Sequence, residues 1–298
     1  MKSALAASAV PGMLGQALWG QASLGQASWG GPVLDIHLHP RREGDQELEH
    51  LQGSGVTRAV LLPGVGSEER AKLVVQQHPP NFARFTNADV RQPDAISKLT
   101  SGVKSGAIGF GELKYPVLLD GPEMRRVYDL AADLNVPVLI HFQEGGWNTG
   151  FSRLPQILKE YSKTTFLAHA NSWWAHISAD VDDKIDYPKG AIKPGGLTDK
   201  MLADYPNVYG DLSANSGRNA LARDPEFAAG FIVRHRAKLI FGSDCGCRDG
   251  HGTAQPQAPL NGKCTARETL TLLKQMATPE LFRQIAWNNG TKLLKISG

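Results

Sequence analysis

Short apolar runs alternate with amphipathic segments along most of this chain. Five of the runs stop at a residue that can bind a metal or transfer a proton. They are 33–36 before His37, 107–111 before Glu112, 136–140 before His141, 164–168 before His169 and 238–243 before Asp244. Near-continuous apolar runs of this length are typical of strands that are buried on both faces of a parallel sheet.

Segments with helical spacing of apolar residues lie between these runs, at 124–134, 154–161 and 267–276. Strands that alternate with helices indicate βαβ units. Eight strands are expected, beginning near Val33, Arg58, Ala83, Ala107, Val136, Thr164, Asn207 and Lys238. An eight-unit barrel needs about 250 residues, which residues 32–298 supply. We therefore predict an α/β fold, a (β/α)8 TIM barrel, ahead of an open doubly wound sheet.

The tripeptide His37-Leu38-His39 is the most informative motif of the chain. Side chains two apart in a strand point to the same face, so both imidazoles are expected together at a strand end. Neutral imidazole is a good ligand for zinc and similar divalent ions. In a TIM barrel, catalytic groups occupy the C-terminal ends of the strands, where Glu112, His141, His169 and Asp244 are also predicted.

This ordered set of residues resembles the amidohydrolase superfamily, and most closely its amidohydrolase-related (amidohydrolase-2) branch of metal-dependent TIM-barrel hydrolases. The stretch 285–294 also resembles the closing helix of that family. The resemblance covers nearly everything after Gly31. It implies that His37, His39 and Asp244 hold one buried metal, that His141 and His169 hold a second, and that Glu112 bridges the two.

The bridging residue has an alternative, because many relatives use a carboxylated lysine, and Lys114 is predicted on the same face as Glu112. We favour Glu112, which needs no modification and leaves Lys114 to bind an anionic group of the substrate. The resemblance implies one or two divalent ions per chain, zinc in the first place and manganese as the alternative.

Such a centre favours hydrolysis of an ester, lactone or amide by a metal-activated water. Asp244 is expected to accept the proton of that water, and His169 or His176 to protonate the leaving group. The alternative is a one-metal decarboxylase of an aromatic or unsaturated acid, in which His169 transfers the proton. A noncatalytic binding protein is the third hypothesis, and the complete set of ligands argues against it.

The loops after the fifth and sixth predicted strands contain Trp147, Trp173 and His176. Aromatic rings beside amide groups suit a small-molecule substrate with an apolar or sugar face, although these rings could equally fill the mouth of the barrel. Arg218 could bind a carboxylate or phosphate, with a solvated loop arginine as the other interpretation. Asp211 ends the seventh strand, and a structural role is expected for it ahead of a position that lines the site.

The charge and composition of the chain argue against nucleic acid and a membrane span as partners. The net charge is +3, which indicates no nucleic-acid surface, and no apolar stretch reaches the ~18–20 residues of a membrane span. The sequence is compatible with a homo-oligomer and does not decide between it and a monomer.

Residues 1–31 are rich in Ala, Gly, Ser and Gln, with an apolar stretch at 4–10. We interpret them as a signal-like segment for export to the periplasm, with the twin-arginine route as a further hypothesis; a low-complexity tail on a cytoplasmic protein is the alternative.

Three cysteines follow the predicted eighth strand, at 245, 247 and 264. Export would allow a disulfide between Cys247 and Cys264 that closes the loop 248–263, which could act as a mobile lid. In the cytoplasm they would be thiols near a metal. A cysteine-rich zinc site is less favoured, because the sequence shows no obvious fourth ligand.

Overall fold

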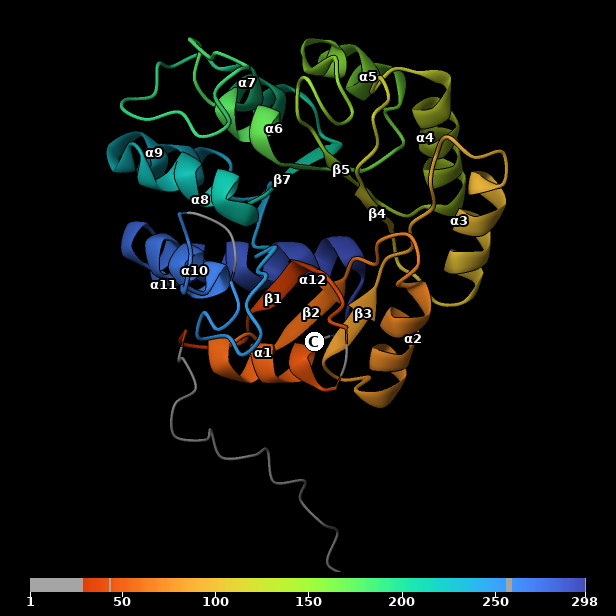
Figure 1. Ribbon diagram of the computed structural model, residues 1–298. Coiled ribbons are helices and arrows are strands. Elements are labelled where there is room, and N and C mark those ends of the chain that lie inside the picture. Colours follow the sequence, from red (N-terminus) through yellow and green to blue (C-terminus); the bar gives the residue numbers. More distant parts are fainter. Residues whose placement is uncertain (1–28, 43, 256–258, 298) are drawn as a thin grey trace, which may run out of the picture.

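The computed structural model describes residues 29–42, 44–255 and 259–297, and contains eight parallel strands separated by helices (Figure 1). The strands are β1 (Leu34–Leu38), β2 (Arg58–Leu61), β3 (Phe82–Arg84), β4 (Phe110–Leu113), β5 (Val138–His141), β6 (Phe166–His169), β7 (Val208–Asp211) and β8 (Leu239–Ile240). The helices are α1 (Gln46–Ser54), α2 (Glu68–Gln77), α3 (Ala95–Lys104), α4 (Pro122–Leu134), α5 (Leu154–Glu160), α6 (Asn171–Ala175), α7 (Leu197–Asp204), α8 (Ala214–Ala222), α9 (Pro225–Arg234), α10 (Thr265–Met276), α11 (Pro279–Arg283) and α12 (Asn289–Leu294). A 3-10 turn, η1 (Phe151–Arg153), precedes α5, and a π-helical turn, η2 (Gln284–Asn288), precedes α12.

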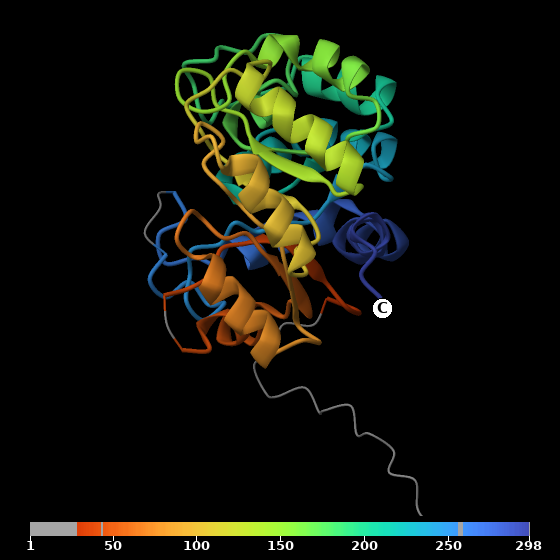
Figure 2. The ribbon, with the colours of Figure 1, turned by 90° about the vertical axis from the view of Figure 1, so that its right-hand side faces the viewer.

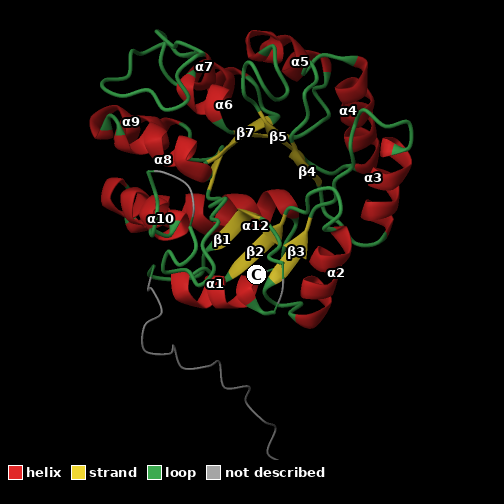
Figure 3. Ribbon diagram, viewed as in Figure 1, coloured by secondary structure: helices red, strands yellow, loops and turns green. Residues whose placement is uncertain are grey.

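The strands form a ring in chain order, with the helices outside it (Figure 3). Regular pairing gives the order β1-β2-β3 in one sheet and β4-β5-β6-β7-β8 in the other. Backbone hydrogen bonds join these sheets on both sides: Ile108 N–H donates to Arg84 O at 2.9 Å, and Ile36 N–H donates to Phe241 O at 3.2 Å. The predicted (β/α)8 barrel is therefore confirmed. In the perpendicular view, α2, α3 and α4 follow one another along its outside (Figure 2).

The predicted strand positions are confirmed, because each strand begins within three residues of its expected start. The largest difference is at β4, which begins at Phe110 instead of Ala107. Pairing with the β3 segment already starts at Ile108, and the isolated bridge between Thr86 and Phe110 shows that this part of the barrel is irregular. Regular strand geometry therefore begins at Phe110, further along the chain than the apolar run suggests.

An apolar core fills the inside of the barrel and positions the polar residues above it. The cluster contains Leu34, Ile36, Val60, Leu62, Phe85, Leu139, Leu167, Ile240 and, from α12, Leu294. Because side chains alternate along a strand, His141 points to the same side of β5 as Leu139, and His169 to the same side of β6 as Leu167. The interior is apolar at the α12 end and rich in histidine at the C-terminal ends of the strands.

Within the described part of the chain, no helix is both long and apolar enough to cross a membrane. The signal-like segment predicted at 1–31 lies almost entirely outside the described residues, which begin at Trp29. Trp29 itself contacts the barrel: its indole N–H donates to Ser54 O at 2.9 Å, and its ring stacks on Phe282 with a centroid distance of 6.3 Å.

Candidate metal centre

The six residues predicted as metal ligands converge at the C-terminal ends of the strands. His37 lies in β1 and His39 directly follows it, Glu112 lies in β4, His141 and His169 end β5 and β6, and Asp244 lies in the segment after β8. Two sets of three, His37 with His39 and Glu112, and Glu112 with His141 and His169, each place their ligand atoms within 4.8 Å of one another. Residues more than 200 positions apart thus share one site.

The carboxylate of Glu112 lies between two pairs of histidines. Its Oε2 is 3.4 Å from Nε2 of His39 and 4.0 Å from Nε2 of His37. Its Oε1 is 2.5 Å from Nδ1 of His141 and 3.5 Å from Nε2 of His169. Each carboxylate oxygen therefore faces a different pair of imidazoles, which is the arrangement that a carboxylate shared by two metal ions requires.

Asp244 approaches the first of these pairs from the opposite side of the barrel. Its Oδ1 is 3.3 Å from Nε2 of His39 and 3.8 Å from Nε2 of His37. The backbone of Asp244 is left-handed, with φ of 46°, and its N–H donates to His37 O at 2.8 Å. Aspartate adopts this region more readily than most residues, and the hydrogen bond fixes the side chain over the site.

Most of these separations exceed the usual hydrogen-bond distance of about 2.7–3.2 Å and suit ligands of a common ion. Two ligand atoms at about 2.1 Å from a tetrahedral zinc are roughly 3.4 Å apart. Among the described residues, the buried Nε2 atoms of His37 and His169 have no hydrogen-bond partner. An unpaired buried nitrogen is costly, and coordination of a cation would satisfy both. The residues present therefore fit a divalent metal.

A buried hydrogen-bond network holds two of the imidazoles from behind. Nδ1 of His37 lies 2.7 Å from Oδ2 of Asp211, which also accepts a hydrogen bond from Ser213 Oγ at 2.7 Å. Nδ1 of His169 lies 2.7 Å from the same hydroxyl. Partners at Nδ1 fix the orientation of each ring and leave Nε2 for a metal. Asp211 is therefore part of the site, beyond the structural role expected for it.

Asp35, in β1, connects the strand that carries His37 to the segment after β8 that carries Asp244. Its buried carboxylate accepts hydrogen bonds from the backbone N–H groups of His37 at 2.9 Å and Ser243 at 2.8 Å, and from the Ser243 hydroxyl at 2.5 Å. Burial, partly offset by these hydrogen bonds, raises the pKa of Asp35 to about 7. The residue positions the ends of β1 and β8 relative to each other.

Opposite charges decide the protonation of the metal-free cluster. Burial alone would lower the pKa of His37, but nearby carboxylates, first of all Asp211, raise it. Burial would raise the pKa of Glu112, and the hydrogen bond from His141 helps to hold it well below its usual range. Burial would also raise the pKa of Asp244, but neighbouring groups, His37 first among them, lower it to about 2. Glu112 and Asp244 are therefore ionised and available as ligands at neutral pH.

Two residues predicted to contact substrate lie together beside the site. Lys114 directly follows β4 and is exposed, and its Nζ lies 5.8 Å from the ring centroid of Trp147. Trp147 is partly exposed, and its backbone pairs with that of Gln143 near the end of β5. A cation and an aromatic face are thus available on the side of the cluster where β4 and β5 end.

The other three predicted substrate residues have partners elsewhere. Trp173 has no exposed surface and packs in the core, in a cluster other than the one that fills the inside of the barrel. Nε2 of His176 lies 2.8 Å from Asp183, and Arg218 on α8 pairs with Glu268 on α10 at 3.3 Å. Trp173 is thus buried, and His176 and Arg218 each form an ion pair; a role for these three residues in substrate binding stays a prediction.

The predicted disulfide between Cys247 and Cys264 is not formed in this structure, in which all three cysteines are free and buried. The thiol of Cys245 lies 3.0 Å from that of Cys247 and 3.8 Å from that of Cys264. Three sulfur atoms thus share one cluster, so no pair is singled out. The predicted lid, residues 248–263, includes residues 256–258, which are outside the described part of the chain.

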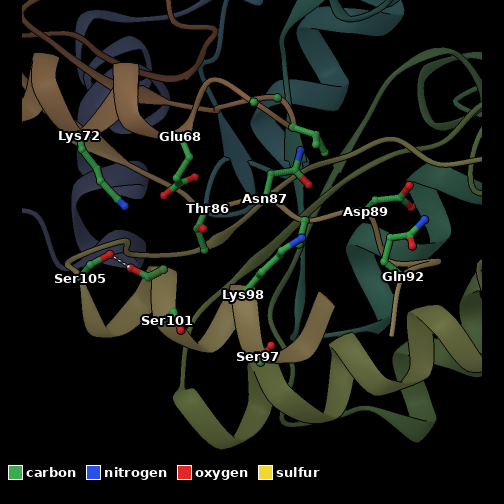
Figure 4. A pocket seen from close by; sticks show the side chains of 15 residues that line it. Glu68, Lys72, Thr86, Asn87, Asp89, Gln92, Ser97, Lys98, Ser101 and Ser105 are labelled. Atoms are coloured by element: carbon green, nitrogen blue, oxygen red, sulfur yellow. Dashed lines mark hydrogen bonds between the residues drawn. The ribbon is translucent and has the colours of Figure 1, made fainter. Parts of the chain in front are cut away.

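A separate cavity of about 680 Å³ lies beside α3 and the ends of β2 and β3 (Figure 4). Polar side chains line it, among them Lys72, Thr86, Asn87 and Lys98. None of the six candidate metal ligands lines this cavity. One residue connects the two regions, because Asn87 Nδ2 donates to the backbone oxygen of Glu112 at 2.8 Å. The cavity thus adjoins the β4 backbone without opening on the carboxylate of Glu112.

The sequence interpretation missed two members of the network, Asp35 and Ser213. Each lies two residues from a group that it supports, in Asp35-Ile36-His37 and Asp211-Leu212-Ser213. The alternation that singled out His37 and His39 could also have found them, because polar residues at i and i+2 in an otherwise apolar strand share a face.

No family model and no curated protein matches the chain. The fold is similar to several solved structures. A probable 2-pyrone-4,6-dicarboxylic acid hydrolase from Acinetobacter baumannii, with citric acid bound, is 15% identical at a TM-score of 0.59, over 89% of this chain and 99% of that one. An uncharacterised TIM-barrel protein from Bordetella bronchiseptica is 14% identical at 0.60, over 89% and 98%.

A third structure is a 5-carboxyvanillate decarboxylase from Novosphingobium aromaticivorans, complexed with manganese and a nitrobenzoic acid. It is 12% identical at a TM-score of 0.52, over 85% of this chain and 80% of that one. The similar structures thus include a hydrolase and a decarboxylase. At these identities the similarity shows the fold alone, and this chain therefore has a TIM-barrel fold.

Proposed function

We propose that this protein is a metal-dependent hydrolase of the amidohydrolase superfamily that cleaves an ester, lactone or amide with a binuclear divalent metal centre. The observation that carries the proposal is the position of Glu112, whose two carboxylate oxygens face two different histidine pairs. A centre with a single ion has no need of a carboxylate in this position.

In this proposal His37, His39 and Asp244 hold one ion, and His141 and His169 hold the other, with Glu112 shared. Imidazole and carboxylate suit zinc, and manganese is the alternative. When bound, two such ions supply an activated water at neutral pH and polarise the carbonyl group of the substrate. Asp211, Ser213 and Asp35 hold the imidazoles and strand ends in place.

Asp244 is the best candidate for the acid–base group. Its side chain is 27% exposed, whereas His169 is fully buried and His176 is held by Asp183. A carboxylate that is ionised at neutral pH can accept the proton of the attacking water and then donate it to the leaving group. Lys114 lies where it could bind a negatively charged part of the substrate.

A one-metal decarboxylase is the second candidate, and the environment of His169 favours it. Burial, followed by the influence of His37, lowers the pKa of His169 well below its usual value, so the ring is neutral. The Ser213 hydroxyl orients it through Nδ1. In this candidate function His37, His39, His141 and Asp244 would hold the ion. Nε2 of His169 would take up a proton from solvent and pass it to the carbon from which carbon dioxide leaves.

The test is a screen of the zinc- and manganese-reconstituted protein against esters, lactones and amides on one side and aromatic carboxylic acids on the other. We expect hydrolysis, and loss of most of it together with one bound ion in Glu112→Gln. Glu160→Gln, which alters an exposed carboxylate on α5 paired with Arg125, is the matched control. Release of carbon dioxide without any hydrolysis would select the decarboxylase.

We also propose that residues 1–31 direct export to the periplasm, on the basis of their composition and apolar stretch. The prediction is checked by fractionating cells that express the full chain and sequencing the N-terminus of the product. A shortened protein in the periplasmic fraction would support export, and an intact N-terminus in the cytoplasm would contradict it.

A further inference from the structure

Four buried side chains outside the Glu112 centre form a second cluster of potential ligands. They are His50 on α1, Cys245 and Cys247 in the segment after β8, and Cys264 at the start of α10. Their ligand atoms all lie within 4.8 Å of one another, and none of the four residues is more than 3% exposed. The sequence separates His50 from the cysteines by almost 200 residues, so the fourth ligand could not be recognised before the fold was known.

We propose that these four residues form a structural zinc site of the Cys3His type, separate from the barrel centre. Three thiolates and one imidazole are one of the common donor sets of structural zinc sites, and four protein ligands leave no open position for substrate. A Cys-x-Cys pair joined by a distant cysteine and a histidine from another element is sufficient to enclose the ion.

The distances fit a tetrahedral ion. The thiol of Cys245 is 3.8 Å from that of Cys264, and the thiol of Cys247 is 3.4 Å from Nδ1 of His50. With zinc–sulfur bonds of about 2.3 Å and a zinc–nitrogen bond of about 2.0 Å, tetrahedral ligand atoms lie roughly 3.5–3.8 Å apart. The 3.0 Å between Cys245 and Cys247 would open by about 0.7 Å.

Hydrogen-bond donors surround the central sulfur atom as they do around metal-bound thiolates. The backbone N–H of Cys247 donates to Cys245 Sγ at 3.4 Å, and Gln255 Nε2 lies 3.9 Å from the same atom. Gln255 is buried and is oriented by Thr265 Oγ1 at 2.9 Å. Donors of this kind stabilise negative charge on sulfur and orient the ligand.

The position of the cluster gives the ion a structural role. Cys245 directly follows Asp244, and Arg41 lies two residues after His39. The guanidinium of Arg41 donates to the backbone oxygens of Cys245 at 2.5 Å and Cys247 at 3.0 Å. An ion at the cysteines would therefore hold the segment that carries Asp244 against α1 and against the segment that carries His39.

The test uses the full chain loaded with cobalt(II) in place of zinc. Cobalt bound to thiolates has a sulfur-to-metal charge-transfer band in the near ultraviolet, which the nitrogen and oxygen ligands of the barrel centre cannot produce. We expect this band in the wild type and in Glu112→Gln, and a clearly weaker band in Cys264→Ser, which keeps only two of the three thiolates. X-ray absorption at the zinc edge of the wild type, which needs no variant, should show sulfur neighbours at about 2.3 Å.

Two results would overturn the proposal. One is an intact mass two hydrogens lower after denaturation without reductant, which would show a disulfide among the three cysteines. The other is three free thiols with no charge-transfer band and no sulfur around zinc. Because the band reports only thiolate ligands, either result leaves the proposed hydrolase untouched, and failure of the hydrolase leaves this site untouched.

Discussion

Oδ2 of Asp211 lies 2.7 Å from Nδ1 of His37, although the two residues are 174 positions apart in the chain. Both side chains are fully buried. The contact holds the imidazole so that Nε2 faces the carboxylates of Glu112 and Asp244. It is the clearest sign that the cluster is organised from behind to receive a cation in front.

We expect Asp211→Asn to weaken metal binding by about 10- to 100-fold, the usual effect of removing a partner of a metal-bound histidine. Titration of the metal-free protein with zinc measures the affinity. Asp183→Asn, which removes the carboxylate beside His176, should leave it unchanged. Equal affinities in the wild type and Asp211→Asn would show that this contact does not position His37 for a metal.

Gly242 has no side chain and therefore leaves room for the contact between Asp211 and His37. A Cβ at this position would lie 2.2 Å from Oδ1 of Asp211 and 2.9 Å from Cβ of His37. We expect Gly242→Ala to lower the free energy of unfolding by about 1–3 kcal/mol and to weaken metal binding, as measured by denaturant titration and zinc titration.

The control for this substitution is Gly230→Ala in α9, where the nearest atom to a new Cβ is the flexible Arg234 side chain at 3.2 Å. Alanine favours a helix over glycine by about 1 kcal/mol, so stability should hold or rise there. A Gly242→Ala protein as stable as the wild type would contradict the close packing behind His37.

Protons should compete with the metal. In the metal-free protein the pKa values of His37 and His39 are raised by neighbouring carboxylates, against the effect of burial. Below these raised values the rings are protonated and must lose their protons to bind. Glu112 and Asp244 have lowered pKa values and are already ionised.

Metal affinity should therefore rise with pH until the pH exceeds the raised pKa values of His37 and His39, by up to roughly tenfold per unit for each proton displaced. Calorimetry in two buffers with different ionisation enthalpies measures both the affinity and the protons released. Binding without proton release, at an affinity independent of pH, would be inconsistent with protonated His37 and His39 in the metal-free site.

Lys114 should affect substrate binding and leave the metal in place. We expect Lys114→Met to raise KM for an anionic substrate several-fold with little change in kcat, because the exposed ammonium group beside Trp147 interacts with bound substrate and transition state alike. Lys98→Met, on the exposed face of α3, is the control. An unchanged KM in Lys114→Met would remove Lys114 from the substrate site.

The strands and the candidate ligands could be predicted from the sequence because both depend on local patterns. Buried parallel strands are apolar runs, and the residue that ends each run lies at the functional face of a barrel. This reasoning placed His141 and His169 at the ends of β5 and β6, where the structure has them.

Contacts between distant elements were not predictable in the same way. Nothing near Cys245 in the sequence indicates that His50 completes a four-ligand cluster, because the barrel alone brings α1 against the segment after β8. The sequence left open whether Trp173 faces substrate or fills the barrel mouth, and packing against Phe151 and Trp174 buries it completely. Trp173 lies in α6, and the burial of its side chain depends on tertiary packing, which the local sequence does not encode.

The most direct test of a binuclear centre is a crystal structure of the zinc- or manganese-loaded protein with an anomalous difference map. We expect two peaks, one beside each carboxylate oxygen of Glu112 and roughly 3.5–4 Å apart, with His37 and His39 at the first and His141 and His169 at the second. A single peak held by His37, His39, His141 and Asp244, with Glu112 in contact with no ion, would contradict it.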